Sequence, residues 1–133
     1  AVRYVIEGGL ENGNYFTVLE SVKALERLGT EQAVRGLIDH GLHNKQNWNI
    51  GAVVGKALEK MGSKAAPILI REVVERGDYD LMSKTIPMLG RIGDERAVEP
   101  LLKVAKSKWL YSDIAKKALT QIEAKRKRGL KHA

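Results

Sequence analysis

The sequence repeats itself at an interval of about 32 residues, and this feature constrains the fold more than any other. Four segments align at this offset: 1–10, 33–42, 65–70 and 97–102. Three glycines form a second column by closing a Leu-x-x-apolar-Gly pattern: Gly29, Gly62 and Gly93. A unit of this length cannot bury its apolar face alone, so the units are expected to stack on their neighbours.

Each unit is predicted to contain two helices and no strand. In 79–92, Leu81, Met88, Leu89 and Ile92 fall at i, i+7, i+8 and i+11, the spacing of one helix face. The first helices of the units are predicted at 15–28, 48–61, 79–92 and 110–127. The second helices are predicted at 1–12, 31–43, 64–76 and 95–107.

A two-residue corner is predicted between the helices of a unit, where the repeat Gly is followed by Thr30, Ser63 or Asp94. Gly commonly ends a helix in the left-handed conformation, and Thr, Ser or Asp caps the next helix. The fold prediction is therefore all-α, an α-α superhelix of about eight helices in four antiparallel pairs. One repeat domain is predicted over residues 1–128. Because the chain opens in a second-type helix, this domain is expected to be a fragment of a longer solenoid.

Residues 89–102, Leu-Gly-Arg-Ile-Gly-Asp-Glu-Arg-Ala-Val-Glu-Pro-Leu-Leu, resemble the HEAT-like repeat of the phycobilisome-lyase type. Segments 24–38 and 57–70 resemble it less closely. The resemblance implies a curved solenoid whose second helices line the concave side, in a family of mostly adaptors and scaffolds. The family's usual first-helix Arg is absent at the expected positions, and no His-Glu pair of the HEAT-like iron hydroxylases is present.

Composition excludes some classes of protein and leaves an uneven charge. The 133 residues include no Cys, which excludes disulfides and thiolate chemistry. No apolar run is long enough for a membrane span, so no membrane partner is expected. The absence of Cys fits an intracellular protein, and a cytoplasmic location is expected. Residues 1–102 hold 13 Lys and Arg against 14 Asp and Glu, whereas residues 103–133 hold 10 against 2. The excess culminates in a predicted basic C-terminal tail at 125–133.

The exposed positions of the second helices are the predicted partner-binding surface. Its candidate residues are Arg3, Arg35, Asp39, Arg71 and Lys103. A groove for a phosphate backbone should be positive throughout. The mixed signs of these residues instead favour a protein partner, and the oligomeric state is not predicted.

An aromatic residue stands at the start of each of the first three first helices, and Trp109 holds the equivalent place just before the fourth. The column consists of Tyr15, Trp48, Tyr79 and Trp109. One interpretation is structural, with each ring filling the seam between repeats. The other is a ladder of partly exposed rings that stacks on a ligand or partner.

The basic residues near the C-terminus form the strongest charge signal: Lys116, Lys117, Lys125, Arg126, Lys127, Arg128 and Lys131. They suit the polar outer face that a terminal repeat needs. Alternatively, they provide an electrostatic handle for nucleic acid, an acidic protein or an import receptor.

No catalytic, cofactor or metal site is predicted. His40 and His43 lie at i, i+3 beside Asp39, but zinc needs three or four ligands, so solvated histidines are expected. Gly8, Gly9 and Gly51 lie within helical patterns rather than in a phosphate loop. The predicted function is a non-enzymatic scaffold or adaptor. Nucleic-acid binding through the basic end is the alternative, ahead of a DNA-repair enzyme of the HEAT-like type, which would carry a basic cleft.

Overall fold

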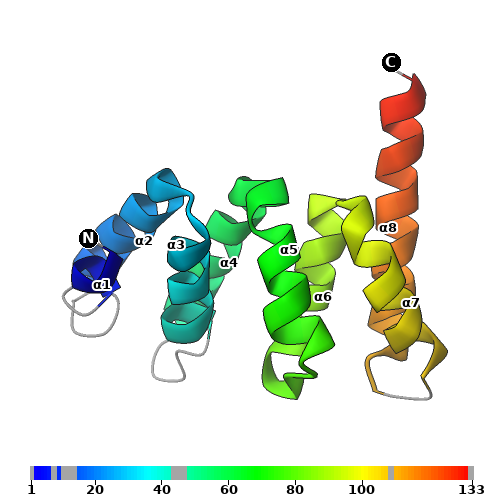
Figure 1. The fold of residues 1–133 in the computed structure, drawn as a ribbon, viewed down its shortest axis with the longest axis horizontal. Helices are drawn as coiled ribbons and strands as arrows, with labels where there is room; N and C mark the ends of the chain where they lie inside the picture. The colour runs from blue at the N-terminus through cyan, green and yellow to red at the C-terminus, as the bar shows by residue number, and fades with distance from the viewer. Residues whose placement is uncertain (1, 7–8, 10–14, 43–47, 108–109, 132–133) are drawn as a thin grey trace. The chain divides into compact units, whose positions relative to one another are not determined.

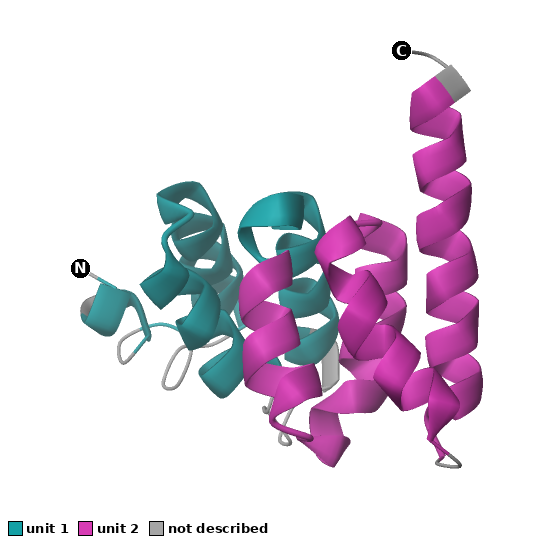
Figure 2. Ribbon diagram, turned by 45° about the vertical axis from the view of Figure 1, so that its right-hand side comes forward, with its two compact units in different colours: residues 1–65 teal, residues 66–133 magenta. Residues whose placement is uncertain are grey.

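The computed structural model describes residues 2–6, 9, 15–42, 48–107 and 110–131. The described residues form helices and the turns between them, and none of these residues lies in a strand, which confirms the all-α prediction. The chain divides into two compact units, residues 1–65 and residues 66–133, which Figure 2 distinguishes by colour. The predicted single domain over 1–128 and the superhelical path remain predictions.

Unit 1 consists of helices joined by turns (Figure 1). Its elements are α1 (Val2–Val5), α2 (Tyr15–Leu28), α3 (Glu31–Leu37), the π-helical turn η2 (Ile38–Leu42), α4 (Trp48–Met61) and the 3-10 turn η3 (Gly62–Lys64). Helix α2 packs against α3 and α4, and α4 also packs against η2. The fully buried side chains of this unit include Leu25, Leu37, Val54 and Leu58. These apolar side chains form the core of the unit.

Unit 2 repeats the arrangement and ends in a longer helix. Its elements are α5 (Ala66–Leu69), the π-helical turn η4 (Ile70–Glu75), α6 (Tyr79–Ile92), the 3-10 turn η5 (Glu95–Ala97), α7 (Val98–Lys106) and α8 (Ser112–Lys131). Helix α8 packs against both α6 and α7. Its contribution to the core comes from Ala115, Ala118 and Ile122, which are almost fully buried.

The predicted Gly corners are confirmed by the backbone. Gly29, Gly62 and Gly93 have φ angles of 60°, 56° and 75°, the left-handed conformation that ends a helix. The side chain of Thr30 accepts a hydrogen bond from the Ala33 amide at 3.1 Å, so it caps α3. At the other two corners a 3-10 turn comes first, and α5 and α7 therefore begin two or three residues later than predicted.

The bounds of the first helices agree with the prediction at α2, α4 and α6. The fourth prediction, 110–127, is wrong at both ends, because α8 runs from Ser112 to Lys131. Lys and Arg are good helix formers and favour the C-terminal end of a helix dipole. The described part of the predicted basic tail, residues 125–131, is therefore helical.

The second helices depart from the prediction because they are not regular throughout. Residues 38–42 and 70–75 are π-helical, and these two turns begin 32 residues apart. A π turn holds one residue more than an α turn and rotates the side chains that follow it. A period of 3.6 applied to the whole segment could not reveal this. Of the predicted helix 1–12, the structure describes α1 with Ile6 and Gly9, and the rest lies outside the described residues.

Candidate protein-binding pockets

The first pocket lies in unit 1 between two successive second helices. It has a volume of about 340 Å³. Its lining residues come from α1, α3 and η2: Val2, Arg3, Ile6, Gln32, Gly36, Asp39 and His40. We call it the unit 1 pocket. Its lining combines the apolar residues Val2 and Ile6 with the oppositely charged Arg3 and Asp39.

The second pocket lies in unit 2, again between two successive second helices. It is larger, about 640 Å³, and we call it the unit 2 pocket. Its lining residues come from η4, η5 and α7: Val74, Glu75, Arg96, Glu99, Pro100, Lys103 and Val104. The exposed charges of Glu75, Glu99 and Lys103 enter no ion pair among the described residues. They are therefore available to a bound partner.

The two pockets occupy equivalent places in their units. Four lining positions of the unit 1 pocket recur 64 residues later, which is two repeats, in the unit 2 pocket: Gln32 and Arg96, Gly36 and Pro100, Asp39 and Lys103, His40 and Val104. The side chain differs at every one of these positions. The repeat thus preserves the pocket and changes its chemistry, from an acid to a base at Asp39 and Lys103.

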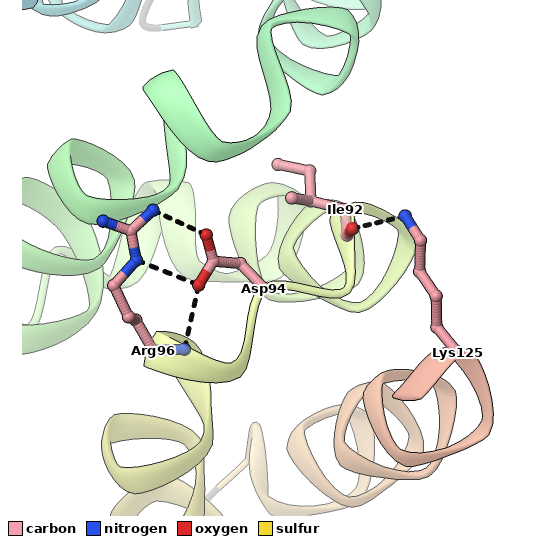
Figure 3. A network of polar contacts seen from close by, with 4 residues as sticks. All are labelled: Ile92, Asp94, Arg96 and Lys125. Carbon is pink, nitrogen blue, oxygen red and sulfur yellow. Dashed lines mark hydrogen bonds and ion pairs between the residues drawn. The ribbon is translucent and has the colours of Figure 1, made fainter. Parts of the chain in front are cut away.

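Asp94 holds Arg96 at the edge of the unit 2 pocket (Figure 3). Its Oδ1 accepts hydrogen bonds from the Arg96 backbone amide at 2.9 Å and from Nε at 3.0 Å, and its Oδ2 accepts one from Nη2 at 2.7 Å. The hydrogen bonds of the Arg96 guanidinium, aided by that of the backbone amide, lower the pKa of the Asp94 carboxyl below its ordinary value. One side chain therefore caps η5 and fixes the orientation of a cation.

Replacing Asp94 by Ala is expected to lower the free energy of unfolding by about 1 kcal/mol at pH 7, the usual cost of losing a helix-capping side chain. Because the folded pKa of Asp94 is lowered, its contribution is complete above its ordinary pKa of about 4 and is lost as the pH falls through the folded value. Urea denaturation of both proteins from pH 7 to pH 2 measures this, and the difference should shrink below about pH 4. Asp80→Ala, an exposed position in α6, is the control; a gap at Asp94 that is independent of pH would contradict the assignment.

Three of the five predicted partner-binding residues line these pockets: Arg3, Asp39 and Lys103. Arg35 is exposed on α3, and its Nη2 lies 2.9 Å from Glu31 Oε1. Arg71 is exposed on η4, and its Nε lies 3.6 Å from Glu72 Oε1. Neither arginine is among the lining residues of the two pockets.

The aromatic column is only partly within the described structure. Tyr15 and Tyr79, the first residues of α2 and α6, are 49% and 51% exposed. The backbone oxygen of Tyr79 accepts a hydrogen bond from the Tyr111 hydroxyl at 2.8 Å, which ties the start of α6 to the residues preceding α8. Trp48 begins α4, but its side chain lies outside the described residues, as does Trp109. The two described rings leave about half of their surface for a partner, and both interpretations of the column stay predictions.

The predicted basic residues all belong to α8. Two of them have partners: Lys125 Nζ donates to the Ile92 carbonyl of α6 at 2.6 Å, and Arg126 bonds to Glu123 within α8 itself. Lys116, Lys117, Lys127 and Arg128 are exposed. The side chain of Lys131, at the end of α8, lies outside the described residues.

No metal centre can be assembled from the described part of the chain, where no three His, Asp or Glu residues lie close enough to hold an ion. His40 lines the unit 1 pocket, and His43 lies outside the described residues. None of the helices in the described ranges is long and apolar enough to cross a membrane.

Sequence reasoning missed several lining residues, above all Gln32 and Arg96. Both stand two positions after the cap residue of their corner, Thr30 or Asp94. The repeat alignment already showed that Gln32 and Arg96 are equivalent positions. In the structure, this position near the start of a second helix lines the pocket. Val74 and Glu75 were missed for a different reason, because they lie on the π-helical turn η4.

The paired helices, the left-handed Gly corners and the equivalent pockets define an α-helical repeat protein. Residues 89–107 match the family model of the PBS lyase HEAT-like repeat. This segment runs from the end of α6 through the Asp94 corner and α7. The match agrees with the resemblance of residues 89–102 to this repeat. No curated protein matches the chain.

Proposed function

We propose that this protein is a non-enzymatic scaffold or adaptor that binds a protein partner along the surface of its second helices. The observation that carries the proposal is the recurrence of the unit 1 pocket, at equivalent positions and with different side chains, as the unit 2 pocket. Helical repeats of the HEAT-like kind use such surfaces to bind other proteins. The resemblance of residues 89–102 to the HEAT-like repeat implies that this surface is the concave side of the solenoid.

The chemistry of the pockets favours a protein segment over other ligands. Each pocket combines apolar walls with both signs of charge, such as Glu99 and Lys103 in unit 2. A peptide can place an apolar side chain in the pocket and opposite charges at its rim, which is the usual anatomy of a protein interface. A phosphate backbone would be repelled by Glu75 and Glu99. The changes between equivalent positions would give each pocket a different preference along one partner.

The proposal is tested by exchanging two charges in the unit 2 pocket. The double variant E99K/K103E keeps the net charge and reverses the polarity of α7 at the pocket. Partners captured by the wild-type chain are quantified by mass spectrometry and then measured with purified protein. The exchange is expected to weaken binding about tenfold or more, because like charges replace complementary ones.

The matched control is D80K/K84E on α6, which exchanges the same kinds of charge at the same i, i+4 spacing on an exposed first-helix surface. It should leave the affinity within about twofold, as expected for charges away from the interface. Circular dichroism verifies that both variants fold. Equal binding by the wild type and E99K/K103E, or equal losses in both variants, would contradict the proposal.

A further inference from the structure

Helix α8 carries more positive charge than its packing uses. The aliphatic part of Lys125 packs over Gly93, and its Nζ donates to the Ile92 carbonyl at 2.6 Å (Figure 3). It thus satisfies a carbonyl at the C-terminal end of α6, where a cation is favourable. Arg126 donates through Nε to Glu123 Oε2 at 3.1 Å and through Nη2 to Oε1 at 2.5 Å. These two cations have structural partners.

Four other cations have no such role. Lys116, Lys117, Lys127 and Arg128 are exposed, and none of their side chains forms a hydrogen bond or an ion pair with a described residue. At about 100° per residue, the four lie within roughly 120° of the helix circumference. The buried residues Ala115, Ala118 and Ile122 lie on the opposite side. We call the four residues the α8 stripe.

The α8 stripe faces solvent along a helix that extends beyond its neighbours. Figures 1 and 2 both show the C-terminal half of α8 continuing past the ends of α6 and α7. Residues 123–130 are all exposed, and a side chain added at Gly129 would meet open space. This part of the helix is therefore accessible from several sides, with a single carboxylate in its described turns, Glu123, already bound to Arg126.

The spacing of the stripe suits a long polyanion better than a single charged group. Lys116 and Lys117 form one pair and Lys127 and Arg128 another, and the second pair follows the first at an offset of eleven residues, about 16 Å along the helix. A DNA duplex carries about one negative charge per 1.7 Å, so both pairs can reach phosphates of one duplex. The described part of α8 has two exposed carboxylates: Asp113 lies within the arc of the stripe, and Glu123 lies about 20° outside it and is bound to Arg126. The four cations therefore leave the stripe with a net positive charge.

We propose that the α8 stripe binds the phosphate backbone of double-stranded DNA without reading its sequence. Positive charge predominates in the stripe, whereas in the linings of the two pockets carboxylates are as numerous as Arg and Lys. Binding through four phosphate contacts releases about four counterions, so affinity should fall about a hundredfold between 50 and 200 mM salt. Such contacts to phosphates do not distinguish one base from another, so binding should not depend on the DNA sequence.

The test measures fluorescence anisotropy of a labelled 20-base-pair DNA duplex titrated with the full chain at 50 and 200 mM salt. The variant K116Q/K117Q/K127Q/R128Q is expected to lose about a hundredfold in affinity at 50 mM salt, and two duplexes of unrelated sequence should bind the wild type equally. The control K23Q/K56Q/K60Q/K64Q removes the same charge from exposed positions of unit 1 and should retain affinity within about threefold. Lys125→Met should lower the melting temperature and leave DNA affinity within the same limit.

Two results would overturn the proposal. One is a flat titration at 50 mM salt. The other is an equal loss of affinity in the unit 1 control, which would assign binding to net charge rather than to the stripe. Poly-glutamate and vesicles containing anionic lipid are tested in parallel. Tighter binding of either than of DNA at equal salt would assign the stripe to an acidic protein or a membrane surface and reject the DNA assignment.

Discussion

Replacing Leu89 by Ala is expected to lower the free energy of unfolding by about 2–5 kcal/mol, the range for removing a large apolar side chain from a packed core. Leu89 is fully buried in α6, in the best-preserved copy of the repeat motif. Truncating it leaves a cavity in the helix that contacts both α5 and α8. Urea denaturation followed by circular dichroism measures the loss, and hydrogen exchange should locate it in unit 2.

The matched control for this prediction is Leu110→Ala. Leu110 is 84% exposed, so the same chemical truncation should change the free energy of unfolding by no more than about 0.5 kcal/mol. Similar losses in the two variants would mean that Leu89 is not part of a packed core. The interpretation that the repeated apolar positions serve to pack the helices together would then be wrong.

Gly41→Ala is expected to destabilise unit 1 by about 1–3 kcal/mol, the cost of overpacking a well-filled core. A Cβ at Gly41 would lie 2.5 Å from Val54 Cγ2 and 3.0 Å from Val54 Cγ1. Val54 is itself fully buried in α4 and β-branched, so its methyl groups have little freedom to move aside. The absence of a side chain at Gly41 is therefore what lets the π-helical turn η2 approach α4.

The same substitution at Gly129 should have the opposite sign. Gly129 lies in α8 with open space around it, so Ala there gains helix propensity and meets no neighbour. The gain should be a few tenths of a kcal/mol, since the position is close to the helix end. Thermal denaturation of both variants gives the comparison. A stable Gly41→Ala protein with native hydrogen exchange in η2 and α4 would contradict the close approach.

The repeat predicted the parts of the fold that depend on local chemistry. Gly29, Gly62 and Gly93 end their helices in the left-handed conformation, which Gly adopts readily because it has no Cβ. The helical spacing of apolar residues such as Leu81 and Leu89 predicted α6 with its correct bounds. These features follow from residue type and spacing within a single unit, which is why one sequence was enough.

The features that depend on contacts between elements were not predictable in the same way. The π-helical turns change which side chains reach the pockets, and no residue type identifies them. The sequence alone predicts that the seven basic residues form one patch. In the structure, Lys125 instead bonds to Ile92 of α6, and Arg126 bonds to Glu123 in the preceding turn of α8. Of the candidate surface, Arg3, Asp39 and Lys103 line the two pockets, and their role in binding a partner stays a prediction. The equivalent pockets emerged from the packing of successive second helices.

Site-specific photo-cross-linking tests the central claim most directly, that the second helices bind a protein partner. A photoreactive amino acid is placed at Asp39 or Lys103, which line the two pockets, and at Glu20 or Ser83, which are exposed on α2 and α6. The account predicts that one partner, identified by mass spectrometry, is cross-linked from both pocket positions and from neither first-helix position. Cross-linking of the partner from Glu20 and Ser83 alone, or equally from all four positions, would contradict it.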